Sequence, residues 1–376
     1  MRYLSADILF TANTPPKVDT VLVIDDDGLV LDITQRSNVD ENRVEYFQGA
    51  LCPGFVNTHC HIELSHLLAQ MDKHKGLPFF INQIVKKRTS PKDVILDSIV
   101  KADNLMFQNG IVAVGDISNT SASFTIKDSS QIHYHTFIEL FASAPEKAHS
   151  VFQNGLDLIE QCNHSCSLTP HSTYSVSNEL FNLLKSANRG QLISIHNQET
   201  SSEDDLFLKG NGELFNKLKD KAAFVPTGQS ALRSTLAYLT NAPLLLVHNT
   251  YTSESDIRWA MSNHTNLYWA TCPKANRYIE NTLPNYHSFI SQNAKMTIGT
   301  DSLASNDTLS ILEEMKLINS EVSLDHLIEW ACKNGAEFLG LDQLGSIEIG
   351  KKPGINHISR LSKQQLTLES GVNRIV

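Results

Sequence analysis

The sequence contains no long hydrophobic run and no dense cluster of positive charge. No apolar stretch reaches the roughly 18 residues that a membrane-spanning helix needs. The opening residues, MRYLSADILF, lack the charged start and long apolar core of a signal peptide. The formal net charge is -10, and no stripe of Lys and Arg is present that would bind nucleic acid or anionic lipid. We therefore expect a cytoplasmic protein without a membrane or nucleic-acid partner.

Cysteine is also scarce, with six residues in a chain of 376. These residues are scattered, which argues against the dense disulfide framework of a small secreted protein. Cys162 and Cys166, in CNHSC, could in principle hold zinc, but no second cysteine pair or spaced histidine pair follows them. We expect free thiols.

The order of apolar runs and helical segments indicates an α/β fold. Hydrophobic residues make up 41% of the chain and charged residues 19%, as in a packed globular protein. Short apolar runs alternate with segments of helical period, which is the pattern of repeated βα units. Strands are predicted at 52–59, 111–117, 132–140, 166–172, 192–198, 243–249, 266–272 and 295–301, and helices at 91–110, 147–162, 177–190, 253–264 and 324–340. This order predicts a (β/α)8 TIM-type barrel over residues 51–345.

The two ends of the chain have a different pattern. Residues 1–50 contain short β-rich pieces, including DTVLVIDDDGLVLDI with its DDDG turn, and GSIEIGKKPGINHI near the other end also reads as strand. We expect residues 1–50 and 346–376 to pair into a small β domain beside the barrel.

Histidines and carboxylates follow the predicted strands. In PGFVNTHCHIELSH, His59 and His61 are two residues apart, so a strand would present both imidazoles on one face. In a barrel, the ends of the strands converge at the catalytic face. Each residue alone is more often an ordinary polar residue at a strand end, but together they favour one metal site. The other members of this set are His171, His196, Glu199, His248 and Asp301.

The chemistry of these side chains suggests separate roles. The neutral imidazoles of His59, His61 and His196, with the carboxylate of Asp301, suit Zn²⁺ or Fe²⁺ and leave a position for a water. A bound ion lowers the pKa of that water from about 15.7 to roughly 7, which makes it the nucleophile.

The remaining polar residues fit the transfer of protons and the binding of substrate. Glu199 can move the proton of the water, and His248 can orient the nucleophile or stabilise developing charge. His171 can form a hydrogen bond with the substrate. Some related sites use two metals bridged by a carbamylated lysine after the fourth strand, but no lysine lies between Lys147 and Lys185. We therefore predict one divalent metal per chain, with Zn²⁺ as the first choice and Fe²⁺ as the second.

With these motifs, the sequence resembles the amidohydrolase superfamily, in its branch of mononuclear aminohydrolases. The matching segments are PGFVNTHCH, TPHSTYSVS, HNQET, LVHNT, TCPKANRY, GTDSLASN and LGSIEIGKKPG, in this order. The resemblance implies a barrel with a small β-sandwich, metal ligands at His59, His61, His196 and Asp301, an acid/base at Glu199 and a catalytic partner at His248. The closing GKKPGIN departs from the usual Gly-Lys-x-Ala-Asp-Leu, so we expect a minimal β-sandwich.

The loop after His61 is similar to that of the aminodeoxyfutalosine deaminases of menaquinone biosynthesis, which carry a His-x-Glu-x-Ser stretch before a helix that ends in Arg. Glu63 and Ser65 fit that pattern, and Glu63 is therefore a candidate substrate-binding residue. The resemblance therefore implies 6-amino-6-deoxyfutalosine as substrate. Its benzoate carboxylate calls for an arginine, for which Arg88 and Arg277 are candidates. A surface charge is an equally good reading of each one.

Other functions remain open at this point. The alternatives are a guanine, S-adenosylhomocysteine or cytosine deaminase, a triazine chlorohydrolase, and a catalytically silent assembly protein of the same fold. The complete ligand set favours an enzyme with a small-molecule substrate. A homodimer is one of the oligomeric states that the sequence leaves open.

Overall fold

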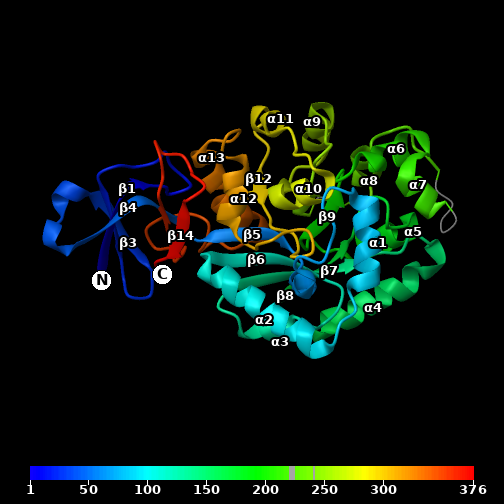
Figure 1. Cartoon of the computed structure of the whole chain (residues 1–376), viewed down its shortest axis with the longest axis horizontal. Helices are drawn as coiled ribbons and strands as arrows, with labels where there is room; N and C mark the ends of the chain where they lie inside the picture. The colour runs from blue at the N-terminus through cyan, green and yellow to red at the C-terminus, as the bar shows by residue number, and fades with distance from the viewer. Residues whose placement is uncertain (220–224, 240–241) are drawn as a thin grey trace.

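Both ends of the chain contribute to one six-stranded sheet in the computed structural model, which describes residues 1–219, 225–239 and 242–376. The strand order is β14-β13-β4-β1-β2-β3. Figure 1 shows this sheet at one end of the molecule, with both termini beside it. The bounds are β1 (Arg2–Leu9), β2 (Thr20–Ile24), β3 (Val30–Gln35), β4 (Val44–Pro53), β13 (Ile355–Ser359) and β14 (Gly371–Arg374). Strands from both terminal segments thus pair in one sheet.

The central part of the chain forms two parallel four-stranded sheets, β5-β6-β7-β8 and β12-β11-β10-β9. Each predicted strand has a counterpart in the structure. The bounds are β5 (Phe55–Cys60), β6 (Ile111–Ser118), β7 (His133–Leu140), β8 (Ser165–Pro170), β9 (Ile193–Asn197), β10 (Leu244–His248), β11 (Leu267–Thr271) and β12 (Met296–Ile298). The strand predicted at 52–59 starts later because Cys52 and Pro53 still belong to β4, where they pair with β13.

The two parallel sheets meet at two edges. Near the end of β5, a bridge joins Cys60 to Asp301, and the N–H groups of Thr300 and Asp301 both donate to the carbonyl of His59 at 3.0 Å. After β8, the N–H of His196 donates to the carbonyl of His171 at 2.9 Å. Four of the predicted site residues, His59, Asp301, His171 and His196, therefore lie where β5 meets β12 and where β8 meets β9.

Helices lie around the two parallel sheets (Figure 1). Their bounds are α1 (Leu77–Lys87), α2 (Lys92–Gln108), α3 (Phe124–Ser129), α4 (Ala148–Gln161), α5 (Asn178–Ala187), α6 (Ser201–Lys209), α7 (Gly212–Leu218), α8 (Ala231–Leu236), α9 (Glu254–Asn263), α10 (Pro273–Glu280), α11 (Tyr286–Ser291), α12 (Ile311–Ile318), α13 (Leu324–Ile328) and α14 (Asn334–Leu339). Short 3-10 turns are η1 (Arg36–Asn38), η2 (Glu41–Arg43), η3 (Ile62–Leu67) and η4 (Pro145–Lys147). None of the helices in the described residues is long and apolar enough to cross a bilayer.

The helix predicted at 324–340 is interrupted. A π-helical turn, η5 (Glu329–Lys333), separates α13 from α14. The Asn334 N–H bonds to the carbonyl of Glu329, five residues earlier, which widens the turn. The hydrophobic period of the sequence is too coarse to distinguish such a turn from a continuous α-helix.

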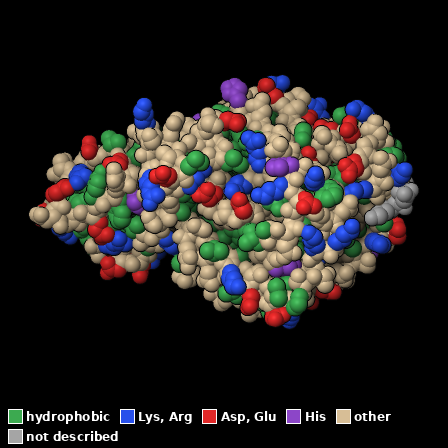
Figure 2. Space-filling view, viewed as in Figure 1, with side chains coloured by type: hydrophobic (Ala, Val, Ile, Leu, Met, Phe, Trp, Pro, Cys, Tyr) green, Lys and Arg blue, Asp and Glu red, His purple; other side chains and the backbone are tan. Residues whose placement is uncertain are grey.

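The surface and the cysteines agree with the composition. On the face shown in Figure 2, basic and acidic side chains are interspersed. All six cysteines are free thiols, and the groups of described residues that could hold a metal contain no cysteine.

Candidate metal centre

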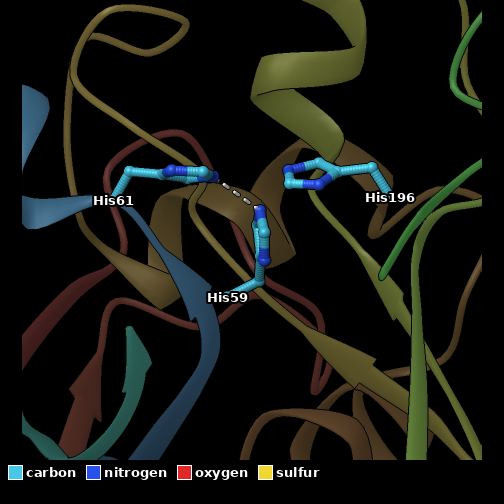
Figure 3. A group of neighbouring side chains, drawn as sticks. All are labelled: His59, His61 and His196. Carbon is cyan, nitrogen blue, oxygen red and sulfur yellow. Dashed lines mark hydrogen bonds between the residues drawn. The ribbon is translucent and has the colours of Figure 1, made fainter. Parts of the chain in front are cut away.

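Three imidazoles and one carboxylate converge at the carboxyl ends of the parallel strands. His59 is in β5, His61 follows that strand directly, His196 is in β9, and Asp301 follows β12. Figure 3 shows the rings of His59, His61 and His196 directed toward one another. The Nε2 atoms of His59 and His61 are 3.2 Å apart. Asp301 Oδ1 lies 3.4 Å from His61 Nε2 and 3.7 Å from His59 Nε2.

These distances fit a shared metal ion. With Zn–N bonds of about 2.0–2.1 Å, two nitrogens of a tetrahedral site lie about 3.3 Å apart, close to the His59–His61 separation. His59, His61 and His196 each offer a ligand atom within 4.8 Å of the others. Burial lowers the pKa of His61 and, together with the neighbouring histidines, of His196. Both rings are therefore neutral at pH 7, as metal ligands must be.

The backbone around residue 300 brings the carboxylate to the histidines. Gly299 packs so closely on His59 that an added Cβ would lie 2.8 Å from His59 Cβ, so the close approach requires glycine. Asp301 has a positive φ of 56°, and its Oδ2 accepts a 2.5 Å hydrogen bond from Ser305 Oγ. Burial alone would raise the pKa of Asp301, but the neighbouring imidazoles of His59, His61 and His248 hold it below its usual range.

The orientation of His196 is fixed by the strand beside it. His196 Nδ1 donates to the carbonyl of His171 at 2.7 Å, which leaves Nε2 free to bind a metal. Glu139, in β7, also lies near this ring, with Oε1 3.5 Å from His196 Nδ1. That oxygen is buried and has no hydrogen-bond partner. Glu139 was missed from the sequence, although its position close to the end of a predicted strand is a signal that could have found it.

Glu199 and His248 lie beside the cluster. Their side chains are buried, and His248 Nε2 is 3.7 Å from Glu199 Oε2. Burial, with the charges of Asp301 and Glu203, raises the pKa of Glu199 well above its usual value. Burial lowers the pKa of His248 to about 4. A carboxyl group that holds its proton and a neutral imidazole that can accept one are suited to acid–base chemistry.

The remaining predicted residues include His171, which lies beside the cluster, and two arginines on other elements. The His171 ring is 4.8 Å from that of His196, and its Nδ1 is 2.7 Å from Ser175 Oγ. Arg88 is half-buried at the end of α1, and Arg277 is exposed on α10. The structure thus brings His171 to the cluster, whereas the two arginines lie on separate helices.

Glu63 makes internal contacts. Its buried carboxylate accepts hydrogen bonds from Thr120 Oγ1 at 2.8 Å and from the N–H of Asn119 at 3.1 Å. Burial raises its pKa to about 7. In this arrangement Glu63 joins the turn after His61 to the loop after β6.

The sequence profile of the Amidohydrolase family matches residues 50–368 of this chain. The chain belongs to the Amidohydrolase family. Among curated relatives, this amidohydrolase is 23% identical over 345 residues to an adenosine deaminase of Helicobacter pylori, covering 87% of this chain and 84% of the relative. It is 26% identical over 320 residues to an aminodeoxyfutalosine deaminase of Nitratiruptor sp., covering 80% and 76%.

Solved structures show the same fold. The aminofutalosine deaminase of Helicobacter pylori, solved with methylthio-coformycin, superposes on this amidohydrolase with a TM-score of 0.83 at 19% identity, covering 100% of both chains. An adenosine deaminase of Xanthomonas campestris with bound zinc gives a TM-score of 0.75 at 17% identity, covering 98% of this chain and 86% of the other.

Proposed function

We propose that this amidohydrolase is a hydrolytic deaminase that acts on the exocyclic amine of a purine-type nucleoside. The observation that carries this proposal is the buried Glu199–His248 pair beside a His/Asp cluster, with Nε2 and Oε2 3.7 Å apart. Replacement of an amine by a hydroxyl requires an activated water and a group that moves its protons to the leaving nitrogen. The names of the relatives, adenosine deaminase and aminodeoxyfutalosine deaminase, support the same reaction.

The donor set suits one divalent metal per chain, held by His59, His61, His196 and Asp301. We propose Zn²⁺ as the first choice, because imidazole and carboxylate ligands suit it, and Fe²⁺ as the second. When bound, such an ion would lower the pKa of a coordinated water so that it can react at neutral pH.

The protein's own residues would then handle the protons and the substrate. Glu199 would move protons between the attacking water and the leaving amine, because burial raises its pKa and favours the protonated carboxyl group that can donate to the amine. His248, neutral and held by Asn276, would hydrogen-bond the developing tetrahedral centre. His171, at the rim of the cluster, would contact the substrate.

We also infer that the eight parallel strands close into one TIM-type barrel. The bridges between Cys60 and Asp301 and between Ser172 and His196 support closure, since they join the two parallel sheets at both edges. Residues 1–50 and 346–376 would then form a separate β domain beside the barrel. Cytoplasmic location, the absence of nucleic-acid and membrane partners, and a homodimer remain predictions.

For the specific substrate we propose 6-amino-6-deoxyfutalosine. The His-x-Glu-x-Ser stretch at His61, Glu63 and Ser65 and the relatives of that name support it. Arg88 or Arg277 would bind the benzoate carboxylate.

The test is an ammonia-release assay of the metal-loaded protein on 6-amino-6-deoxyfutalosine, adenosine, 5'-deoxyadenosine, S-adenosylhomocysteine, guanine, cytosine and a chlorotriazine, with chloride release followed for the last. The Glu199→Gln variant serves as the blank. We expect the highest kcat/KM on the carboxylated nucleoside. Faster turnover of adenosine would overturn the specific substrate but leave the deaminase proposal intact, whereas no ammonia from any amine would overturn both.

A further inference from the structure

A lysine is buried outside the His/Asp cluster, and its ammonium group is held by an ion pair and two hydrogen bonds. Lys127, in α3, has a relative exposure of 4%. Its Nζ lies 2.6 Å from Asp116 Oδ2 and donates to Ser118 Oγ and Thr136 Oγ1, both at 2.9 Å. All three N–H bonds are therefore used, which is what a buried ammonium group requires. None of these contacts includes a residue of the proposed catalytic set.

Asp116, the carboxylate partner of Lys127, connects this ion pair to the backbone beside His61. Asp116, in β6, is fully buried, and its Oδ1 accepts a 2.8 Å hydrogen bond from the backbone N–H of Ile62. Ile62 follows His61 directly and begins η3, where an N–H group has no partner within the helix. On the other side of His61, Cys60 is in register with Asp116 across the β5–β6 pair. Asp116 thus contacts the chain on both sides of the His61 backbone.

Further hydrogen bonds extend the network to the surface. Thr136 Oγ1 is 2.8 Å from His164 Nε2. Because Thr136 already accepts from Lys127, its own hydroxyl proton is free to point to that nitrogen. His164 Nδ1 then donates to Asp128 Oδ1 at 2.6 Å. Each donor in this series has an acceptor, so the Lys127 ammonium is held in one orientation.

We propose that Asp116 is a positioning residue for His61. Asp116 anchors the Ile62 N–H and so fixes the turn that aims the His61 imidazole at the cluster, whereas Lys127 balances the buried charge of the carboxylate. This inference rests on the proposed function only in taking His61 as a metal ligand.

A purely structural ion pair makes a different prediction. Buried ion pairs are often replaced by apolar residues of similar size without loss of stability, and such a replacement here would leave metal affinity unchanged. If Asp116 positions His61, metal binding must instead depend on an acceptor oxygen at residue 116, whether or not the ion pair is present.

Two double variants separate these readings. In Asp116→Asn with Lys127→Met, the charges are removed but the amide oxygen can still accept from Ile62 N–H. In Asp116→Leu with Lys127→Met, the charges and the acceptor are both removed, and the side chain at residue 116 keeps a similar branched shape at a larger volume. Lys316→Met serves as the control, because Lys316 is a mostly buried lysine paired with Glu313 on α12.

Zn²⁺ affinity, measured by competition with a chromogenic chelator on apo protein, is the primary readout, with the visible absorption of the Co²⁺-loaded protein as the second. We expect the Asn/Met variant and the control to remain within about threefold of the parent. Loss of an outer-shell contact typically costs about 10–100-fold in metal affinity, and we expect this loss for the Leu/Met variant, with an altered Co²⁺ spectrum. Equal affinity and spectra for the two double variants would overturn the proposal.

Folding is checked by circular dichroism, and Asp116→Ala with Lys127→Met gives a smaller apolar alternative. If both apolar variants fail to fold while the Asn/Met variant folds, the pair is a folding element and the positioning role is rejected. These readouts need no substrate. If the ammonia assay rejected the deaminase proposal, the metal-affinity test of the positioning role would therefore be unaffected.

Discussion

Asn276 Oδ1 lies 2.9 Å from His248 Nδ1, and both residues are almost fully buried. As the acceptor, the amide oxygen places the imidazole proton on Nδ1 and leaves the Nε2 lone pair on the side of Glu199. Asn276 lies in α10, in the segment CPKANRY. This helix therefore determines which tautomer of a strand-end histidine faces the site.

Replacement of Asn276 should change the pH dependence of turnover. Burial lowers the pKa of His248 to about 4, so the ring is neutral through the physiological range. Asn276→Asp would add a negative charge beside Nδ1 and raise the pKa of His248. The His248 ring would then become protonated at a higher pH, so kcat would begin to fall at a higher pH than in the parent as the solution is acidified. Asn276→Leu should instead lower kcat by about 10–100-fold at every pH. Ammonia release between pH 4.5 and 9 measures both, and an unchanged acid limb in Asn276→Asp would contradict the role of His248.

Glu199→Gln should keep the metal and lose turnover. The amide is close in shape to the carboxyl group but cannot shuttle protons, so we expect kcat to fall by a factor of about 100–10000 or more. Metal content by mass spectrometry should equal that of the parent. Glu179→Gln, at an exposed glutamate on α5, is the matched control and should be fully active. Loss of metal from Glu199→Gln would make Glu199 a ligand and refute its assignment as acid/base.

The sequence predicted the strands and the convergence of polar residues because both follow from local patterns. Each short apolar run forms a strand of a parallel sheet. His59, His196 and Asp301 come together because the carboxyl ends of parallel strands lie at one edge of the sheet. The exact strand bounds depend on tertiary pairing. β4 continues to Pro53 because β13, about 300 residues later, pairs with it.

The residues that were missed act through contacts that no local pattern encodes. Asn276 lies 28 positions from His248 in the chain, and Asp116 supports Ile62 from 54 positions away. Glu63 was predicted to meet the substrate, and its carboxylate accepts hydrogen bonds from the loop after β6. Spacing along the chain identifies a side chain that can reach the site, but the neighbouring loop decides its partner.

Removal of the metal should abolish activity and lower thermal stability. A ligand that binds only the folded state stabilises it by mass action, and the proposed ion would join residues at the ends of β5, β9 and β12. Exhaustive chelation should therefore lower Tm and remove activity, and Zn²⁺ or Fe²⁺ should restore both at close to one ion per chain. Full activity after chelation would exclude the metal mechanism. A stoichiometry near two would contradict the mononuclear prediction.

Glu203 should matter for stability through the start of α6. Its buried carboxylate accepts from the N–H of Glu199 at 2.7 Å and of Gln198 at 3.0 Å, as part of a capping box with Thr200. Glu203→Ala would leave these donors buried without partners, and we expect a loss of about 2–4 kcal/mol in the free energy of unfolding. Glu203→Gln keeps one acceptor oxygen and should lose less. Urea unfolding followed by circular dichroism gives both values, and equal losses would show that side-chain packing outweighs the hydrogen bonds.

Arg88 and Arg277 are both candidates for binding the substrate carboxylate, and kinetics on two nucleosides can distinguish them. Neither guanidinium forms an ion pair with a carboxylate among the described residues of the structure, so each is available to a ligand. A charge-assisted hydrogen bond to a carboxylate is worth about 1.5–3 kcal/mol, or roughly 10–100-fold in affinity.

If one of the two arginines binds the benzoate of the substrate, its replacement by Met should raise KM for 6-amino-6-deoxyfutalosine by about that factor. KM for adenosine, which has no carboxylate, should stay nearly constant. The other arginine variant then serves as a control of the same chemistry. Steady-state kinetics on both nucleosides measures the ratio of the two KM values. An equal effect on both substrates, or none with either variant, would reject the two arginines as carboxylate ligands while leaving the deaminase proposal in place.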